Sequence, residues 1–128
     1  MRELLKQATV LYVEDEEEIR EKIGLALGRR VGKLYLASNG QEGLELCLQH
    51  KPHIVVTDLE MPVLDGLGMI KKIREAFNRT IPIVVITAYQ DEDHFTDLAD
   101  SYIFKPVIIR ELEETLNRLI HDQGLLIR

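Results

Sequence analysis

The stretch "IVVTDLEMPVLDG" (residues 54–66) decides the fold, because a run of β-branched residues stops at an aspartate and a loop with proline and glycine follows. Its apolar start is continuous rather than alternating, which indicates a strand buried on both faces, as in a parallel sheet. Asp58 then stands at the carboxyl end of that strand, where parallel α/β sheets bind their ligands. The other strands decide what Asp58 does there.

Similar apolar runs alternate with helical patterns along the whole chain. The expected strands cover residues 9–13, 33–37, 54–56, 81–86 and 102–104. Apolar residues recur at helical spacing between and after them, for example Ile19, Ile23 and Leu27, and the weakest such pattern lies over 91–100. The alternation predicts an α/β fold of the (βα)5 type, a doubly wound parallel five-stranded sheet.

Composition narrows the class of protein. A length of 128 residues fits a single domain over residues 1–128. The net charge of −6 argues against direct nucleic acid binding, which needs clustered basic residues. Cys47 is the only cysteine, so a disulfide framework is excluded. The amino terminus is not that of a signal peptide and no segment reaches transmembrane length, so we expect a cytoplasmic protein without membrane contact.

The residues at the strand ends form a chemically coherent set. They are Glu14 and Asp15, Asp58, Thr87, and Lys105. Each has an ordinary structural explanation: acidic residues favour a helix start, aspartate and threonine form turns and caps, and most lysines are solvated. Those explanations do not account for four strands that deliver three acidic side chains, a hydroxyl and an ammonium to one edge.

Clustered carboxylates repel one another unless a cation lies among them, and hard oxygen ligands suit Mg²⁺, with Mn²⁺ as an alternative. We expect Asp15 and Asp58 to coordinate the metal. Glu14 would act indirectly in the acidic pocket, and a backbone carbonyl just past Asp58, that of Glu60, would complete the protein ligands.

The chemistry that uses this set is phosphoryl transfer to a carboxylate. Asp58 is an anion at neutral pH and needs no general base to attack phosphorus. Lys105 and Thr87 would neutralise charge on the transferred group, so catalysis would be positioning plus electrostatics. The product would be an aspartyl phosphate at Asp58.

At this point the sequence resembles the receiver domain of bacterial two-component response regulators. Four blocks carry the resemblance: "VLYVEDEEEIRE", "TDLEMPVLDG", "VVITAY" and "YIFKPV". They occur in the family's order, at close to its spacing, and span residues 10 to 107. The resemblance implies a flavodoxin-like receiver fold with Asp58 as phosphoacceptor, Thr87 as switch hydroxyl and Lys105 as the residue that pairs with the phosphate.

The resemblance also implies roles for neighbouring residues. Pro106 would follow Lys105 in a cis peptide. Tyr102 matches the aromatic residue that turns inward when the switch threonine moves. Glu60 and Tyr89 stand where the family tunes the lifetime of its phosphate. The phosphoryl donor would be a histidine kinase, a histidine phosphotransfer protein or a small molecule such as acetyl phosphate.

The sequence departs from the family between Thr87 and Lys105, where it is about one helical turn shorter than is typical. "LADSY" also replaces the Gly-Ala that usually precedes the last strand. We therefore expect a shortened or irregular fourth helix over 91–100. That helix belongs to the face that many receivers use for output and dimerisation, so a standard output mode or homodimer is in doubt.

Two alternative functions stay open at this stage. One is a constitutive pseudo-receiver that binds partners without phosphorylation, against which the complete set of acids, Thr87 and Lys105 argues. The other is a small Mg²⁺-dependent phosphohydrolase with an aspartyl nucleophile, which would want a D-x-D after the first strand, where this chain has "EDE". Residues 124–128 would begin a linker to an effector domain or contact an output protein.

Overall fold

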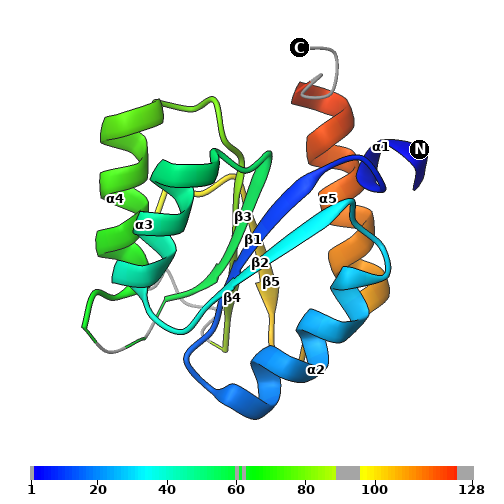
Figure 1. The fold of residues 1–128 in the computed structure, drawn as a ribbon, viewed down its shortest axis with the longest axis horizontal. Coiled ribbons are helices and arrows are strands. Elements are labelled where there is room, and N and C mark those ends of the chain that lie inside the picture. Colours follow the sequence, from blue (N-terminus) through cyan, green and yellow to red (C-terminus); the bar gives the residue numbers. More distant parts are fainter. Residues whose placement is uncertain (1, 60, 62, 89–95, 124–128) are drawn as a thin grey trace.

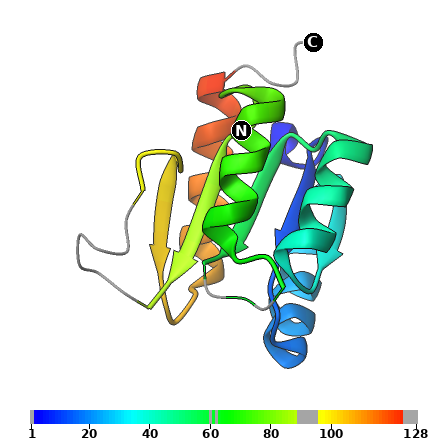
Figure 2. The same ribbon diagram turned by 90° about the vertical axis from the view of Figure 1, so that its left-hand side faces the viewer.

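A five-stranded parallel sheet forms the centre of the protein, in a computed structural model that describes residues 2–59, 61, 63–88 and 96–123. The strand order is β2-β1-β3-β4-β5, so the order reverses beside β1, as in doubly wound sheets. Figure 2 shows β4 and β5 running in the same direction. The strands are β1 (Thr9–Val13), β2 (Lys33–Ala37), β3 (Ile54–Asp58), β4 (Ile83–Thr87) and β5 (Ser101–Phe104). The predicted fold class is confirmed.

Helices cover both faces of the sheet (Figure 1), with α3 and α4 on one side and α1, α2 and α5 on the other. Their bounds are α1 (Arg2–Leu5), α2 (Glu17–Gly28), α3 (Gly40–His50), α4 (Gly66–Phe77) and α5 (Ile109–Gln123). The short helix α1 was not predicted. In the part of the chain that the structure describes, no helix has both the length and the apolar character needed to cross a membrane.

The core consists of two apolar clusters separated by the sheet. Val10 and Tyr12 of β1 pack with α2 and α5, whereas Leu11 and Val13 pack with α3 and α4. This alternation follows from the pleat, which points successive side chains to opposite faces. The central strands β3 and β4 are buried at every position, as the continuous apolar runs predict, and Asp58 is itself the last residue of β3.

The part of the β4–β5 connection that the structure describes contains no helix, and the predicted shortened or irregular fourth helix over 91–100 falls half outside it and stays a prediction. Residues 96–100 form turns, and residues 89–95 lie outside the described part of the chain. The segment 96–100 is fixed to its surroundings by the buried Arg74 of α4. The Arg74 guanidinium donates hydrogen bonds to the carbonyls of Leu98 (2.9 Å) and Ile81 (2.7 Å) and to the Asp100 carboxylate (2.7 Å).

Candidate functional site

Asp58 is held rigidly at the carboxyl edge of the sheet. It ends a strand that is buried throughout, and only 8% of its own surface is exposed. The Leu59 backbone N–H donates a hydrogen bond to Oδ1 at 2.8 Å, and the Lys105 ammonium donates one to Oδ2 at 2.9 Å. Both carboxylate oxygens therefore have a fixed orientation.

The loop after Asp58 is pressed against it by the start of α4. The Gly66 N–H donates to the Leu59 carbonyl at 2.7 Å, and a Cβ on Gly66 would lie 2.1 Å from the Asp58 carbonyl oxygen. Any larger residue would therefore displace the backbone of Asp58. Asp65 caps α4 by accepting a hydrogen bond from the Gly68 N–H at 2.8 Å, which fixes where the helix begins.

Three acidic side chains meet at this edge. Carboxylate oxygens of Glu14, Asp15 and Asp58 lie within 4.8 Å of one another. Glu14 is almost completely buried, and its Oε2 accepts a hydrogen bond from the Glu16 N–H at 3.1 Å. The sequence-based prediction that these strand ends converge is therefore met by the geometry.

The acidic cluster suits a divalent cation. Burial raises the pKa of the Glu14 carboxyl to about 7, and the neighbouring Asp58 charge adds to the rise. The cluster contains three carboxylates, and the Lys105 ammonium pairs with one of them, Asp58, so the cluster carries excess negative charge in a partly buried place. All available side-chain donors are hard oxygens, the ligands that Mg²⁺ prefers. The residues present thus fit the predicted metal.

Lys105 supplies the cation that the described site already contains. Burial by itself lowers the pKa of its ammonium, but the hydrogen bond to Asp58 and the Asp58 charge outweigh that effect, and the pKa is raised. The Lys105 N–H also donates to the Thr87 carbonyl at 2.9 Å, which fixes the end of β5 beside β4. The peptide bond between Lys105 and Pro106 is cis, as the family resemblance implies.

Thr87 and Tyr102 lie on one face of the sheet. Thr87 ends β4, one residue beyond the partner of Asp58, and is buried. Tyr102 pairs with Val85, two residues before Thr87, so its ring lies on the same side of the sheet. The Tyr102 hydroxyl donates to the Thr96 carbonyl at 2.8 Å and accepts a bond from the Thr96 N–H. Tyr102, the aromatic residue predicted to move with Thr87, is thus hydrogen-bonded to the β4–β5 connection.

The comparisons with known proteins agree with this geometry. A family model for the response regulator receiver domain matches residues 10–117. The chain belongs to this family. The receiver domain is 36% identical over 107 residues to the transcriptional regulatory protein SrrA of Staphylococcus aureus (strain NCTC 8325 / PS 47). That match covers 80% of this chain but 44% of SrrA, so the chain spans less than half the length of that relative.

Solved structures share the receiver fold. A response regulator receiver domain from Clostridium thermocellum superposes with a TM-score of 0.84 at 26% identity, over 93% of this chain and 98% of that one. The chemotaxis response regulator CheY4 of Vibrio cholerae gives a TM-score of 0.79 at 25% identity, over 88% and 98%. The fold around the site is therefore that of known receivers.

Two predicted residues lie outside the described part of this receiver domain. Glu60, predicted as a carbonyl ligand and as a residue that tunes phosphate lifetime, is one, and Tyr89 is the other. Their roles stay predictions. Conversely, sequence reasoning missed Arg20, whose guanidinium donates to the Glu14 carbonyl at 2.8 Å and so braces the end of β1 from α2. The sequence feature that could have identified it is an arginine near the start of α2, the helix that follows the acidic end of β1.

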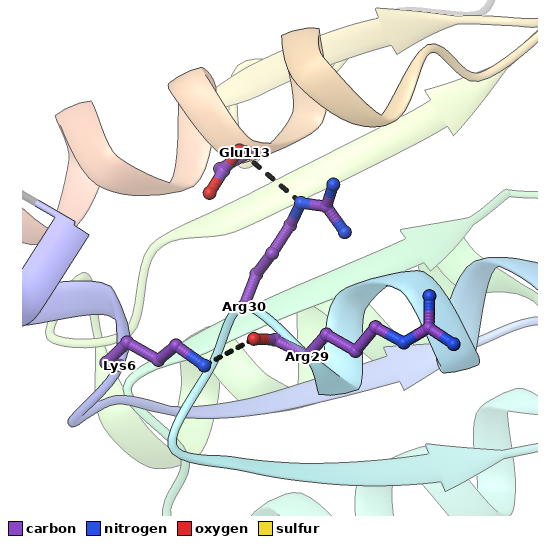
Figure 3. A pocket seen from close by; sticks show the side chains of 4 residues that line it. All are labelled: Lys6, Arg29, Arg30 and Glu113. Carbon is purple, nitrogen blue, oxygen red and sulfur yellow. Dashed lines mark hydrogen bonds and ion pairs between the residues drawn. The ribbon is translucent and has the colours of Figure 1, made fainter.

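Two hollows of the receiver domain differ in their relation to the site. A pocket of about 250 Å³ adjoins it, lined by Glu14 and Lys105 and by apolar side chains that include Ile23 and Val107. Figure 3 shows the other, of about 350 Å³, near the amino ends of β1 and β2. There Lys6 donates to the Arg29 carbonyl and Arg30 pairs with Glu113 at 3.4 Å, so three of its four charged side chains contact the protein itself.

Proposed function

We propose that this receiver domain is a phosphoacceptor switch of a two-component phosphorelay, in which Asp58 takes a phosphoryl group from a phosphohistidine of a histidine kinase or phosphotransfer protein. The observation that carries the proposal is the position of Asp58, between two further carboxylates and the Lys105 ammonium. A nucleophile, a place for a divalent cation and a countercharge for the phosphate then share one edge of the sheet.

The reaction follows from the placement of these groups. An Asp58 oxygen attacks phosphorus, a P–O bond forms, and the P–N bond to the donor imidazole breaks, so that the imidazole nitrogen keeps the electron pair. Lys105 moves its ion pair from the carboxylate to a phosphoryl oxygen, and Thr87 donates its hydroxyl to another. Asp15 and Asp58, with Glu14 nearby, would hold Mg²⁺ (or Mn²⁺), and the metal would supply positive charge to stabilise the transferred phosphoryl group.

Phosphorylation would change conformation through Thr87 and Tyr102. Movement of the Thr87 hydroxyl toward the phosphate frees space on the face of the sheet where the Tyr102 ring lies. Because the Tyr102 hydroxyl is bonded to Thr96, a movement of the ring changes the β4–β5 connection. The phosphate would thus bias an equilibrium between two conformations of that surface.

The wider context belongs to the same proposal. We take residues 1–128 as one receiver domain that catalyses its own phosphorylation and dephosphorylation, in the cytoplasm and without direct contact with nucleic acid or membrane. The tail after residue 123 would lead to an effector domain or an output protein. The support is that SrrA, more than twice as long as the matched region, is a transcriptional regulatory protein.

Mass spectrometry after incubation with acetyl phosphate and Mg²⁺ tests the proposal. We expect one added phosphoryl group, lost on treatment with hydroxylamine and absent from Asp58→Asn. Asp122→Asn, at an exposed aspartate of α5, is the matched control and should be modified like the wild type. A phosphoryl group that persists in Asp58→Asn, or none in the wild type, would sink the proposal.

A further inference from the structure

Tyr12 carries a buried hydroxyl with no partner. Its side chain is 1% exposed in the centre of β1, and its hydroxyl makes no hydrogen bond with any described residue. Buried polar groups nearly always have a partner, and an orphaned one costs stability. A phenylalanine would fill the same core position without that cost, so the hydroxyl itself calls for an explanation.

The register of the sheet places Tyr12 directly beneath the acidic cluster. Tyr12 pairs with Val56 of β3. Two residues further along the two strands stand Glu14 and Asp58, and a step of two residues returns to the same face of a sheet. Tyr12 is therefore one pleat away from two of the three clustered carboxylates.

The side chains that pack near Tyr12 also place it beneath the acidic cluster. Ile23 and Val107 pack against the apolar cluster that contains Tyr12. The same two residues line the 250 Å³ pocket together with Glu14 and Lys105. The Tyr12 ring thus belongs to the core that lies under this pocket, on the side of the sheet to which Glu14 points.

The charges of the cluster reach the Tyr12 hydroxyl. Burial raises the pKa of Tyr12, and the neighbouring charges of Glu14 and Asp58 raise it further. A tyrosine hydroxyl can donate a hydrogen bond to a carboxylate. The Tyr12 hydroxyl thus lies close enough to interact with the buried Glu14 carboxylate but forms no well-aligned hydrogen bond with a described residue, whereas the Glu16 N–H donates to Glu14 Oε2 at 3.1 Å.

From this juxtaposition we propose that Tyr12 is a positioning residue of the cation site, whose hydroxyl donates a hydrogen bond to the ionised Glu14 carboxylate when a divalent cation occupies the acidic cluster. The inference rests on the proposed function and assigns a role to a residue beneath the site. Its physical basis is that groups which hydrogen-bond to the carboxylates of a metal site orient them and thereby set metal affinity.

Calorimetric titration of the intact protein with Mg²⁺ tests this role. We expect Tyr12→Phe to bind Mg²⁺ about tenfold more weakly than the wild type. Tyr35→Phe on the neighbouring strand β2, where the ring stacks on His50, is the matched control and should bind like the wild type. In a Glu14→Gln background, Tyr12→Phe should change the affinity little, because the acceptor charge is gone.

Thermal unfolding separates this role from simple packing. Without metal, Tyr12→Phe should unfold at the same temperature as the wild type or higher, since it removes an unsatisfied buried hydroxyl. With Mg²⁺, it should gain less stability than the wild type. Equal Mg²⁺ affinities, or the same loss of stability with and without Mg²⁺, would overturn the inference and leave the proposed function intact. A wild-type protein that binds no Mg²⁺ would overturn both.

Discussion

The receiver domain contains two ion pairs of similar length whose surroundings differ. Lys105 contacts Asp58 at 2.9 Å at the carboxyl edge of the sheet, and Arg74 contacts Asp100 at 2.7 Å between α4 and the start of β5. Each joins one carboxylate to one basic side chain, and each is largely buried. The groups around them make one pair a reactive site and the other a structural clamp.

At the clamp, every group has a partner. The Arg74 guanidinium donates four hydrogen bonds, three of them to backbone carbonyls, and Asp100 Oδ2 also accepts from the Ile83 N–H at 2.8 Å. One positive charge meets one negative charge. Such a satisfied network holds residues 96–100 of the β4–β5 connection in place.

At the site, the charges do not balance. Lys105 pairs with Asp58 while the carboxylates of Glu14 and Asp15 lie beside it, and the pKa of Glu14 is raised to about 7, mainly by burial and further by the Asp58 charge. Negative charge in excess is unfavourable for the free protein, yet it is what a cation and a phosphoryl group would use. The comparison shows that a reactive site can be recognised by carboxylates that outnumber their basic partners.

Removal of Arg74 should cause the largest loss of stability. Arg74→Ala leaves Asp100 as a partly buried charge without its basic partner and three carbonyls without their donor, so we expect a loss of about 3 kcal/mol in the free energy of unfolding. Chemical denaturation measures it. The control is Arg79→Ala, because the exposed Arg79 bonds the Asp97 carbonyl of the same connection, and this substitution should cost less than about 0.5 kcal/mol.

A loss below about 1 kcal/mol for Arg74→Ala would show that the connection is not clamped as described. A loss as large for Arg79→Ala as for Arg74→Ala would show that exposed and buried contacts hold the segment equally. Either result would remove the contrast between clamp and site.

Neutralising Glu14 should raise the free energy of unfolding rather than lower it. The pKa of Glu14 in the folded state, about 7, lies above its ordinary 4.5, so its contribution to stability is complete below pH 4.5 and is lost as the pH rises through 7. In metal-free protein at about pH 8, Glu14→Gln should therefore be more stable than the wild type by roughly 1–3 kcal/mol. Near pH 4 the two proteins should have similar stability.

Denaturation curves at both pH values, with and without Mg²⁺, check this prediction. Mg²⁺ should stabilise the wild type more at pH 8, where Glu14 is ionised. Glu21→Gln, at an exposed position of α2, should follow the wild type throughout. If Glu14→Gln destabilises the metal-free protein at pH 8, the negative charge of Glu14 is not unfavourable there. The contrast between the site and the Arg74–Asp100 clamp then fails.

Most of the fold and the central site could be predicted from the sequence. Continuous apolar runs identify buried parallel strands, and the residue after each run must then lie at one edge. The apolar runs alone therefore predict that Glu14, Asp15, Asp58 and Lys105 lie together. This prediction holds because strand ends convert positions far apart in sequence into neighbours in space.

The remaining features could not be read from local patterns. Arg74 lies in an amphipathic helix, and nothing in its neighbourhood indicates that its guanidinium is buried against a segment 24 residues later. Tyr12 fits an apolar strand, so its orphaned hydroxyl emerges only when its partners can be counted. Helix α1 is a single turn that depends on packing against α5. Tertiary contacts, rather than propensity, decide each case.

Tyr102 links the site to the clamp. Of the substitutions at Arg74, Glu14 and Tyr102, removal of the Tyr102 hydroxyl should have the smallest effect on stability. Tyr102→Phe removes both hydrogen bonds between this hydroxyl and the Thr96 backbone, each of a kind worth about 0.5–1.5 kcal/mol. We expect amide exchange to accelerate at Leu98, whose N–H bonds the Thr96 hydroxyl, but not in β3. Faster exchange in β3 as well would mean that Tyr102 supports the whole sheet. Exchange unchanged at Leu98 would mean that Arg74 alone holds the connection, and that movement of the Tyr102 ring cannot carry a signal to it.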